Sequence, residues 1–260
     1  MIRRPLQIAL LVLACSAARA DASGINMAWN DCASSGGTAN KLFVCGTNTG
    51  LDFLVGSFVL PIAAPSVIGL EATIAIINMP TYGICDPLPP GDPQGCAYPP
   101  LPSWWQLQMG GCRAGALSVA TNFLQPPFGS GVCMDFWQNQ ALGFSNYEWN
   151  VNGTGQARLR LVVAIPTDQP ASLAAEDQEY YGFQVVLRHT RAIGADACEG
   201  CCTPVTLICE QMTVVQNYPT PDVVLYSSDT QNWVTWNNGN LACVTPTRNR
   251  TWGQIKSTYR

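Results

Sequence analysis

The stretch FLVGSFVLPIAAPSVIGLEATIAII, from Phe53 to Ile77, decides the fold, because two apolar runs flank a turn that contains Pro61 and Pro65. In the second run every other residue is apolar, and Glu71 and Thr73 stand between the apolar residues. A period of two gathers apolar side chains on one face of a strand, whereas a helix would scatter them. The stretch therefore predicts two central β-strands.

Strand patterns recur along the rest of the chain. The first run, 53–60, is apolar on both faces apart from Gly56 and Ser57, which is typical of a strand covered on both sides. Asn152-Gly153 indicates a tight hairpin turn before the clear alternation of 157–165. Similar patterns predict strands at 24–31, 41–45, 104–108, 132–138, 143–151, 179–191, 204–216 and 222–226. Residues 113–122 fit either a strand or a helical turn, and 167–177 is predicted to be a loop.

Roughly ten to thirteen short strands separated by turn residues are typical of an all-β domain. We expect residues 21–260 to form a single β-sandwich of jelly-roll type, with a barrel as the less favoured alternative. Eight prolines within 79–103 predict a long surface loop, because proline cannot donate to a sheet. Thr251 and Gln254 have the spacing of a capping box, which predicts a short C-terminal helix.

Residues 1–20 have the layout of a cleavable secretory signal peptide, with early arginines, an apolar run and Ala18-Arg19-Ala20 ahead of Asp21. The apolar run is about half the ~20 residues that a membrane span needs, so we expect no transmembrane segment in the mature chain. Two alternatives are a lipoprotein processing box ending at Cys15 and a twin-arginine signal at Arg3-Arg4. The chain is predicted to be exported, to the periplasm or outside the cell.

Composition argues against charged polymers as partners. Without the arginines of residues 1–20 the chain keeps ten Lys and Arg against 17 Asp and Glu, and only 12% of all residues are charged. A net negative charge disfavours binding to nucleic acid and to anionic membranes. A chain of this length buries roughly 70 to 75% of its unfolded surface. A core can therefore form without a metal, and no cofactor is expected. The partner stays unknown, with a protein and a glycan as the candidates.

Cysteines are the most informative single residue type. Twelve are present, and in an exported chain they predict a disulfide framework. After loss of Cys15 the eleven candidates are Cys32, Cys45, Cys85, Cys96, Cys112, Cys133, Cys198, Cys201, Cys202, Cys209 and Cys243. Because eleven is odd, at least one thiol is free or pairs with another chain. By proximity in sequence, the predicted pairs are Cys32–Cys45, Cys85–Cys96 and Cys112–Cys133, and the later cysteines stay unassigned.

Several motifs resemble those of a group of exported bacterial proteins with no known activity. They are NMAWNDC at 26–32, F-x-C-x-x-N-x-G at 43–50, LVGSF at 54–58, RLRLVVAIPTDQP at 158–170, EYYGF at 179–183, C-E-G-C-x-x-P-V at 198–205 and TWGQIKSTYR at 251–260. The resemblance spans nearly the whole mature chain and implies export and one common architecture. It implies no functional residue, and Cys85, Cys96 and Cys202 lie outside its motifs.

Thiol and imidazole chemistry is weakly indicated. The Cys-x-x-Cys in CEGCC, at 198–202, is read as structural disulfides, because four-thiolate zinc needs a second such motif and a redox dithiol accompanies a βαβ pattern. His189 is the only histidine, and it is in register with the apolar face of the strand predicted at 179–191. That position is typical of a partly buried structural histidine, so no metal site or catalytic triad is predicted.

Carboxylates and tryptophans carry the remaining hypotheses. Glycoside hydrolysis needs two carboxyl groups within ~5 to 10 Å, and the candidates are Glu71, Glu148, Glu176, Asp177, Glu179 and Glu210. Trp104, Trp105, Trp233 and Trp236 could offer flat apolar faces to sugar rings. Neighbouring strand residues point to opposite faces, so one of each pair is expected in the core.

The sequence thus predicts a non-enzymatic, exported, disulfide-stabilised β-sandwich with a structural or interaction role at or outside the cell envelope. The first alternative is a glycan-binding module that uses exposed tryptophans. The second is a carboxylate-based hydrolase.

Overall fold

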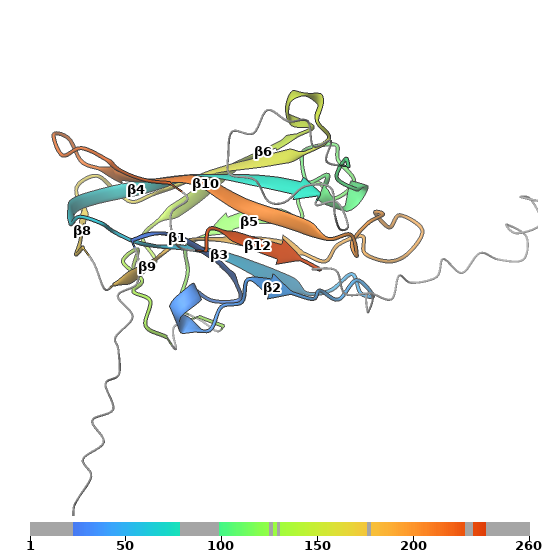
Figure 1. Cartoon of the computed structure of the whole chain (residues 1–260), viewed down its shortest axis with the longest axis horizontal. Helices are drawn as coiled ribbons and strands as arrows, with labels where there is room; N and C mark the ends of the chain where they lie inside the picture. Colours follow the sequence, from blue (N-terminus) through green and yellow to red (C-terminus); the bar gives the residue numbers. More distant parts are fainter. Residues whose placement is uncertain are drawn as a thin grey trace, which may run out of the picture.

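A computed structural model describes residues 23–78, 99–124, 127–128, 131–175, 178–226 and 231–237. In these residues the chain folds into two facing β-sheets that do not close into a barrel (Figure 1). The only helical segments there are three single 3-10 turns: η1 (Ala33–Ser35), η2 (Ser103–Trp105) and η3 (Val151–Gly153). The predicted all-β class is confirmed. The predicted signal peptide, residues 79–98 of the Pro-rich loop and the C-terminal helix lie outside the described residues.

The smaller sheet has four antiparallel strands in the order β1-β3-β9-β5. Their bounds are β1 (Gly24–Trp29), β3 (Leu51–Val59), β9 (Glu179–Arg188) and β5 (Leu117–Ala120). β5 falls in the segment 113–122 that the sequence left open between strand and helix. A bulge at Gly182, opposite the step from Gly56 to Ser57, interrupts the β3–β9 ladder.

The larger sheet has the order β2-β12-β10-β4-β7-β6, with β11 added to β10 and β8 added to β4. Its strands are β2 (Asn40–Lys41), β12 (Trp233–Trp236), β10 (Val205–Gln216), β4 (Ala64–Asn78), β7 (Ala157–Ala164), β6 (Leu142–Trp149), β11 (Val223–Tyr226) and β8 (Ala171–Leu173). All its pairs are antiparallel except β2 with β12.

Both strands expected in the stretch 53–77 are present, as β3 and β4, but they belong to different sheets. β3 pairs with β1 and β9, and β4 pairs with β10 and β7. The turn after Leu60 therefore carries the chain from one sheet to the other. Each strand is central in its own sheet, because both of its edges are paired.

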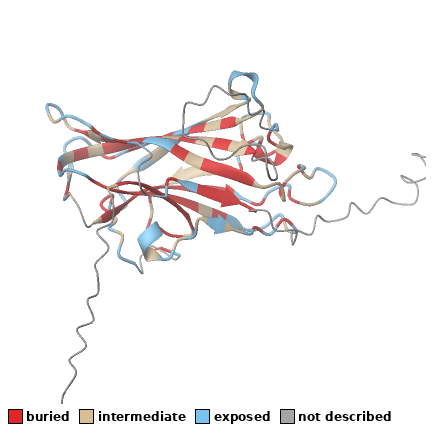
Figure 2. Ribbon diagram, viewed as in Figure 1, coloured by how far each residue is buried: buried red, intermediate tan, exposed pale blue. Residues whose placement is uncertain are grey.

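The apolar core lies between the two sheets, where buried residues concentrate (Figure 2). On the four-stranded sheet the face toward the core carries side chains such as Met27, Leu54, Phe58 and Phe183. Trp29 lies on the same face, and its indole N–H donates to the carbonyl of Thr235 in β12. Strands of this sheet are buried on their other face too, which agrees with the uninterrupted apolar run of β3.

Several strands predicted from local patterns are shorter than expected or absent, because the chain bends there. Residues 104–108, predicted as a strand, begin with the 3-10 turn η2. Residues 132–138, also predicted as a strand, make only one isolated bridge, between Met134 and Tyr180. The strand predicted at 41–45 is reduced to the two residues of β2.

The hairpin between β6 and β7 is confirmed, but its loop is wider than a two-residue turn and contains η3. The predicted loop 167–177 contains the short strand β8.

Among the described residues, three disulfides join distant parts of the chain, and none is a predicted pair. They are Cys32–Cys133, Cys45–Cys201 and Cys112–Cys198, with sequence separations of 101, 156 and 86 residues. Cys202 is also disulfide-bonded, and Cys209 is free and buried. The predictions Cys32–Cys45 and Cys112–Cys133 are wrong because proximity in sequence is no guide when consecutive strands lie in different sheets. The pair Cys85–Cys96 lies outside the described residues.

Among the described residues, no helix has the length and apolar character to cross a membrane.

Candidate functional site

A polar patch lies on the face of the four-stranded sheet that turns away from the core. At its centre is Glu179, whose side chain is 2% exposed. One carboxylate oxygen accepts hydrogen bonds from Asn26 Nδ2, at 3.0 Å, and from the Ser57 hydroxyl. The other accepts the backbone N–H of Ser34 at 3.0 Å. Three donors thus stabilise a buried carboxylate that has no ion-pair partner in the described part of the chain, because hydrogen bonds replace its lost hydration.

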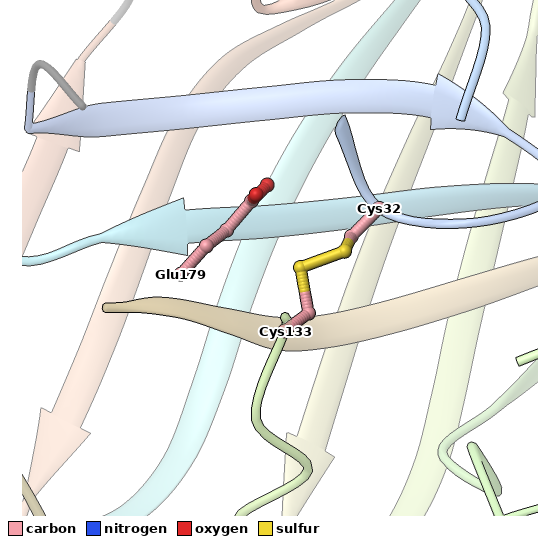
Figure 3. Close-up of side chains that lie close together, drawn as sticks. All are labelled: Cys32, Cys133 and Glu179. Carbon is pink, nitrogen blue, oxygen red and sulfur yellow. A yellow bond between two sulfur atoms is a disulfide. The ribbon is translucent and has the colours of Figure 1, made fainter. Parts of the chain in front are cut away.

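The Cys32–Cys133 disulfide lies beside this carboxylate (Figure 3). The two Sγ atoms and a Glu179 oxygen all lie within 4.8 Å of one another. Two thiolates and a carboxylate are ligands that zinc accepts, but here each sulfur is bonded to the other and neither is a thiolate. Ser34 connects the two features, since its hydroxyl oxygen lies 3.3 Å from Cys133 Sγ. In the oxidised chain the cluster therefore anchors the 32–35 loop to the sheet.

Aromatic side chains cover the rest of this face. Phe123 stacks on Tyr181 with ring centroids 4.3 Å apart, and Phe128 packs edge-on against Phe53 at 5.5 Å. At the bulge of β9, Trp137 donates its indole N–H to the carbonyl of Gly182 at 2.8 Å. The strands of the four-stranded sheet are therefore buried on this face as well.

His189 is buried at the end of β9, as expected of a structural histidine. Its Nε2 contacts an Asp52 oxygen, and the other Asp52 oxygen accepts a hydrogen bond from Lys41 Nζ at 2.9 Å. The Nδ1 atom has no hydrogen-bond partner in the described residues. Nδ1 lies against the backbone at Gly50, so closely that a Cβ atom added to this glycine would be 3.2 Å from it. Lys41, Asp52 and His189 together join β2, β3 and the end of β9. No hydroxyl or thiol of the described residues makes a hydrogen bond to Nδ1, as the nucleophile of a catalytic triad would.

Sequence reasoning missed Asp52 and Lys41. Asp52 begins an apolar run, and Lys41 is one of only two lysines. A charged residue at the edge of a buried strand is the signal that could have indicated a paired buried charge.

Arg113 is a second buried cation, and its side chain is 1% exposed. Its guanidinium donates to the carbonyls of Trp104, Arg188 and Thr190 and lies 3.4 Å from the Trp104 ring centroid. Burial lowers the pKa of Arg113 to about 9, while attraction to Tyr147 and Asp52 opposes that shift. At neutral pH Arg113 is therefore still charged and caps three backbone carbonyls.

The four candidate tryptophans do not form one platform. Trp104, Trp105 and Trp236 are at most 1% exposed, and only Trp233 reaches the surface, at 40%. Trp236 stacks on Phe43 at 3.6 Å between ring centroids and contacts the other two buried indoles. The expectation that one of each pair would be in the core holds for Trp233 and Trp236, which alternate along β12. It is wrong for Trp104 and Trp105, which are both buried because they are in η2 rather than in a strand.

The outer face of the eight-stranded sheet, which points away from the core, is the broad face that the described residues leave open. One row of cross-strand neighbours runs over five strands, from Phe144 through Val162, Glu71 and Thr213 to Val224. At ~4.8 Å between strands this row is about 19 Å wide. Its members are exposed or half-buried. Other residues of the outer face are Leu142, Asn146, Glu148, Arg158, Arg160, Thr73, Ala75, Ile208, Glu210, Gln211, Tyr226 and Trp233.

Three of the four hydrolase candidates that the structure describes are engaged. On the outer face, Arg158 pairs with Glu210 at 3.6 Å, and Arg160 pairs with Glu148 at 3.9 Å. Glu179 belongs to the buried patch on the other sheet, and Glu176 and Asp177 lie outside the described residues. The two arginines thus offset two acidic charges on the outer face, and Glu71 is left there as an exposed acid.

Comparison of the chain with protein-family models, with curated proteins and with solved structures found no match. Function is therefore inferred from the placement of its own residues.

Proposed function

We propose that the chain is an exported, disulfide-stabilised β-sandwich with a non-catalytic interaction role at or outside the cell envelope, and that it recognises its partner through the outer face. The observation that carries the proposal is the contrast between the sheets. The four-stranded sheet is covered on both faces, whereas the outer face presents five strands of mixed apolar and polar side chains.

The composition of the outer face supports recognition rather than core packing. Phe144 and Tyr226 are 67% and 64% exposed, and large aromatic side chains are enriched where proteins bind partners. The charges that surround them are largely paired across strands. Three disulfides support an oxidising compartment, because such bonds persist outside the cytosol.

The test is co-sedimentation of the purified full-length protein with bacterial cell-envelope preparations. Thr73 and Thr213 lie on adjacent strands in the middle of the outer face, and arginines there would block close contact without entering the core. We expect the double variant Thr73→Arg/Thr213→Arg to lose most of its recovery in the envelope pellet. The control is Leu124→Arg, an exposed position beside Phe123 on the covered side of the other sheet. Equal recovery of the wild type and the double variant would contradict the proposal.

Export is tested separately by the intact mass of the protein recovered outside the cytoplasm. We expect a chain that starts at Asp21. A lipid on Cys15 would contradict the expected signal cleavage and place the protein on a membrane.

A further inference from the structure

We propose that the end of the outer face that carries Tyr226 and Trp233 is a binding site for a neutral oligosaccharide. This inference rests on the proposed function, because it names the ligand class of the same face.

The two aromatic residues are held on one line by their pairing. β11 and β12 both pair with β10, whose other edge is occupied by β4. Tyr226 lies opposite Gln211, and Trp233 lies opposite Ile208. Three steps along β10, one of them in a bulge, separate these positions by roughly 7 to 10 Å at ~3.3 Å per residue. That spacing is comparable to one or two pyranose rings of a linear glycan.

Alternation shows that both rings point outward. On β10 the neighbours Cys209 and Met212 are fully buried, whereas Gln211 is exposed and Ile208 is half-buried. Residues directly opposite each other in an antiparallel pair share a face, so Tyr226 and Trp233 share the outer face with Gln211 and Ile208. Their exposed fractions, 64% and 40%, leave ring surface for stacking against the apolar faces of sugars.

Planar polar groups lie along the same stretch of β10. The bulge between Cys209 and Gln211 leaves Glu210 without a partner on β4, and its carboxylate reaches Arg158 of β7 at 3.6 Å. Between β7 and β10, β4 presents only the small side chains Ala75 and Thr73 at this level. The carboxylate and the guanidinium therefore meet over β4, on the other side of β10 from the aromatic pair, while the amide of Gln211, which donates to the Thr213 hydroxyl at 3.2 Å, lies opposite Tyr226. Such groups make paired hydrogen bonds to neighbouring hydroxyls.

The charge balance around the two aromatic residues favours a neutral ligand. The Arg158–Glu210 pair carries no net charge, and the whole chain has an acidic balance of 17 Asp and Glu to 13 Lys and Arg. Phosphate or sulfate polymers would meet no unpaired cation of the described residues near the two aromatics. A neutral, polyhydroxylated chain fits both the paired charges and the separated aromatic rings.

The test measures affinity for a panel of neutral oligosaccharides: β-1,4- and β-1,3-glucans, mannan, xylan and chitin fragments of about six sugars. Binding is followed by tryptophan fluorescence and by affinity electrophoresis of the oxidised full-length protein. We expect Trp233→Ala and Tyr226→Ala each to weaken binding about tenfold, the loss expected when one stacking ring is removed. Trp233→Phe is expected to recover part of it. Leu124→Ala, an exposed position away from the outer face, is the control and is expected to bind like the wild type.

Two results would overturn the inference. One is no binding to any member of the panel at millimolar concentration, and the other is binding that neither substitution weakens. If envelope co-sedimentation still depends on Thr73 and Thr213 in either case, the proposed function survives with a different ligand; if it does not, both proposals fail. A dimer in sedimentation velocity that Trp233→Ala converts to a monomer would identify a second copy of the chain as the occupant and would also overturn the glycan assignment.

Discussion

Glu179 shows how one buried carboxylate can organise a covered sheet face. Its two oxygens accept hydrogen bonds from β1, from β3 and from the loop that carries Cys32. The side chain therefore ties two neighbouring strands and a disulfide-linked loop to the start of β9. A buried donor left without a partner costs about 1 to 3 kcal/mol, so each of the three contacts matters to the stability of this face.

Replacing Glu179 with Gln tests this arrangement. The amide keeps one acceptor oxygen but turns an NH₂ group toward a donor, so we expect a loss of about 1 to 3 kcal/mol in the free energy of unfolding. Urea unfolding of the oxidised protein measures it. Glu71→Gln on the outer face is the matched control, and a change within about 0.5 kcal/mol is expected there. Equal losses at the two positions would show that the hydrogen bonds to Glu179 add nothing.

Cys209 links stability to alkaline pH. Burial raises the pKa of the Cys209 thiol to about 12. In the unfolded chain the thiol keeps its ordinary pKa of 9.0. The unfolded chain therefore loses this proton first, and the stability that Cys209 contributes is complete below pH 9 and declines as pH rises toward 12. By pH 10 the decline is about 1.4 kcal/mol, since one pKa unit is worth ~1.4 kcal/mol.

The comparison of Cys209→Ala with the wild type isolates this effect. We expect the substitution to destabilise the protein less at pH 10 than at pH 8, as measured by urea unfolding at both values. Tyr147, whose pKa is also raised by burial, and Arg113, whose pKa is lowered, titrate in both proteins and cancel in the difference. An identical cost at both pH values would contradict the assignment of a buried neutral thiol.

β4 is the longest strand described, with 15 residues, and it pairs along both edges. Its inward side chains, among them Ile74 with no exposed area, fill the core, and its outward ones contribute to the outer face. We expect Ile74→Ala to cost about 2 to 5 kcal/mol in unfolding free energy, because a cavity replaces a packed side chain. Thr73→Ala, one residue away and outward, should cost much less, and calorimetry of both variants checks the alternation.

Segments that failed to form predicted strands are bent by contacts that local patterns do not reveal. Residues 104–108 follow Pro102, and Arg113 binds the carbonyl of Trp104 while its backbone N–H binds that of Gln106. The carbonyls of Trp104 and Gln106 are therefore not available to pair with a neighbouring strand. In 132–138 the chain turns at Gln138 and Asn139, which both have positive φ, 47° and 63°. Non-glycine residues are uncommon in that region, so apolar content alone overpredicted a strand there.

Long-range disulfides join loops that are remote in sequence. Cys45–Cys201 has the widest sequence separation of the three, 156 residues, and both of its cysteines are buried. In the chain-entropy account, closing a loop of this size stabilises the fold by about 5 kcal/mol, although measured values are typically 2 to 4. We expect the double variant Cys45→Ser/Cys201→Ser to lower the free energy of unfolding by about 2 to 5 kcal/mol. Non-reducing peptide mapping checks the connectivity, and peptides joined through Cys32 and Cys45 would contradict it.

What the amino-acid sequence determined by itself is periodic and compositional. The alternation in 68–77 and 157–165, the turn residues between runs and the many cysteines predicted an all-β, disulfide-stabilised chain, because side-chain period and solvent exposure are local properties of a strand. Most of the long strands, including β4, β7, β9 and β10, fall where these patterns placed them.

Only the tertiary structure decided which elements meet. It placed β3 and β4 in different sheets, joined cysteines at least 86 residues apart, buried three of the four candidate tryptophans and brought Asp52 to His189. Each of these depends on pairings between strands that are remote in sequence, and such pairings are settled by the packing of the whole core rather than by any local run. The Tyr226–Trp233 site depends in the same way on two separate strands that pair with one edge of β10.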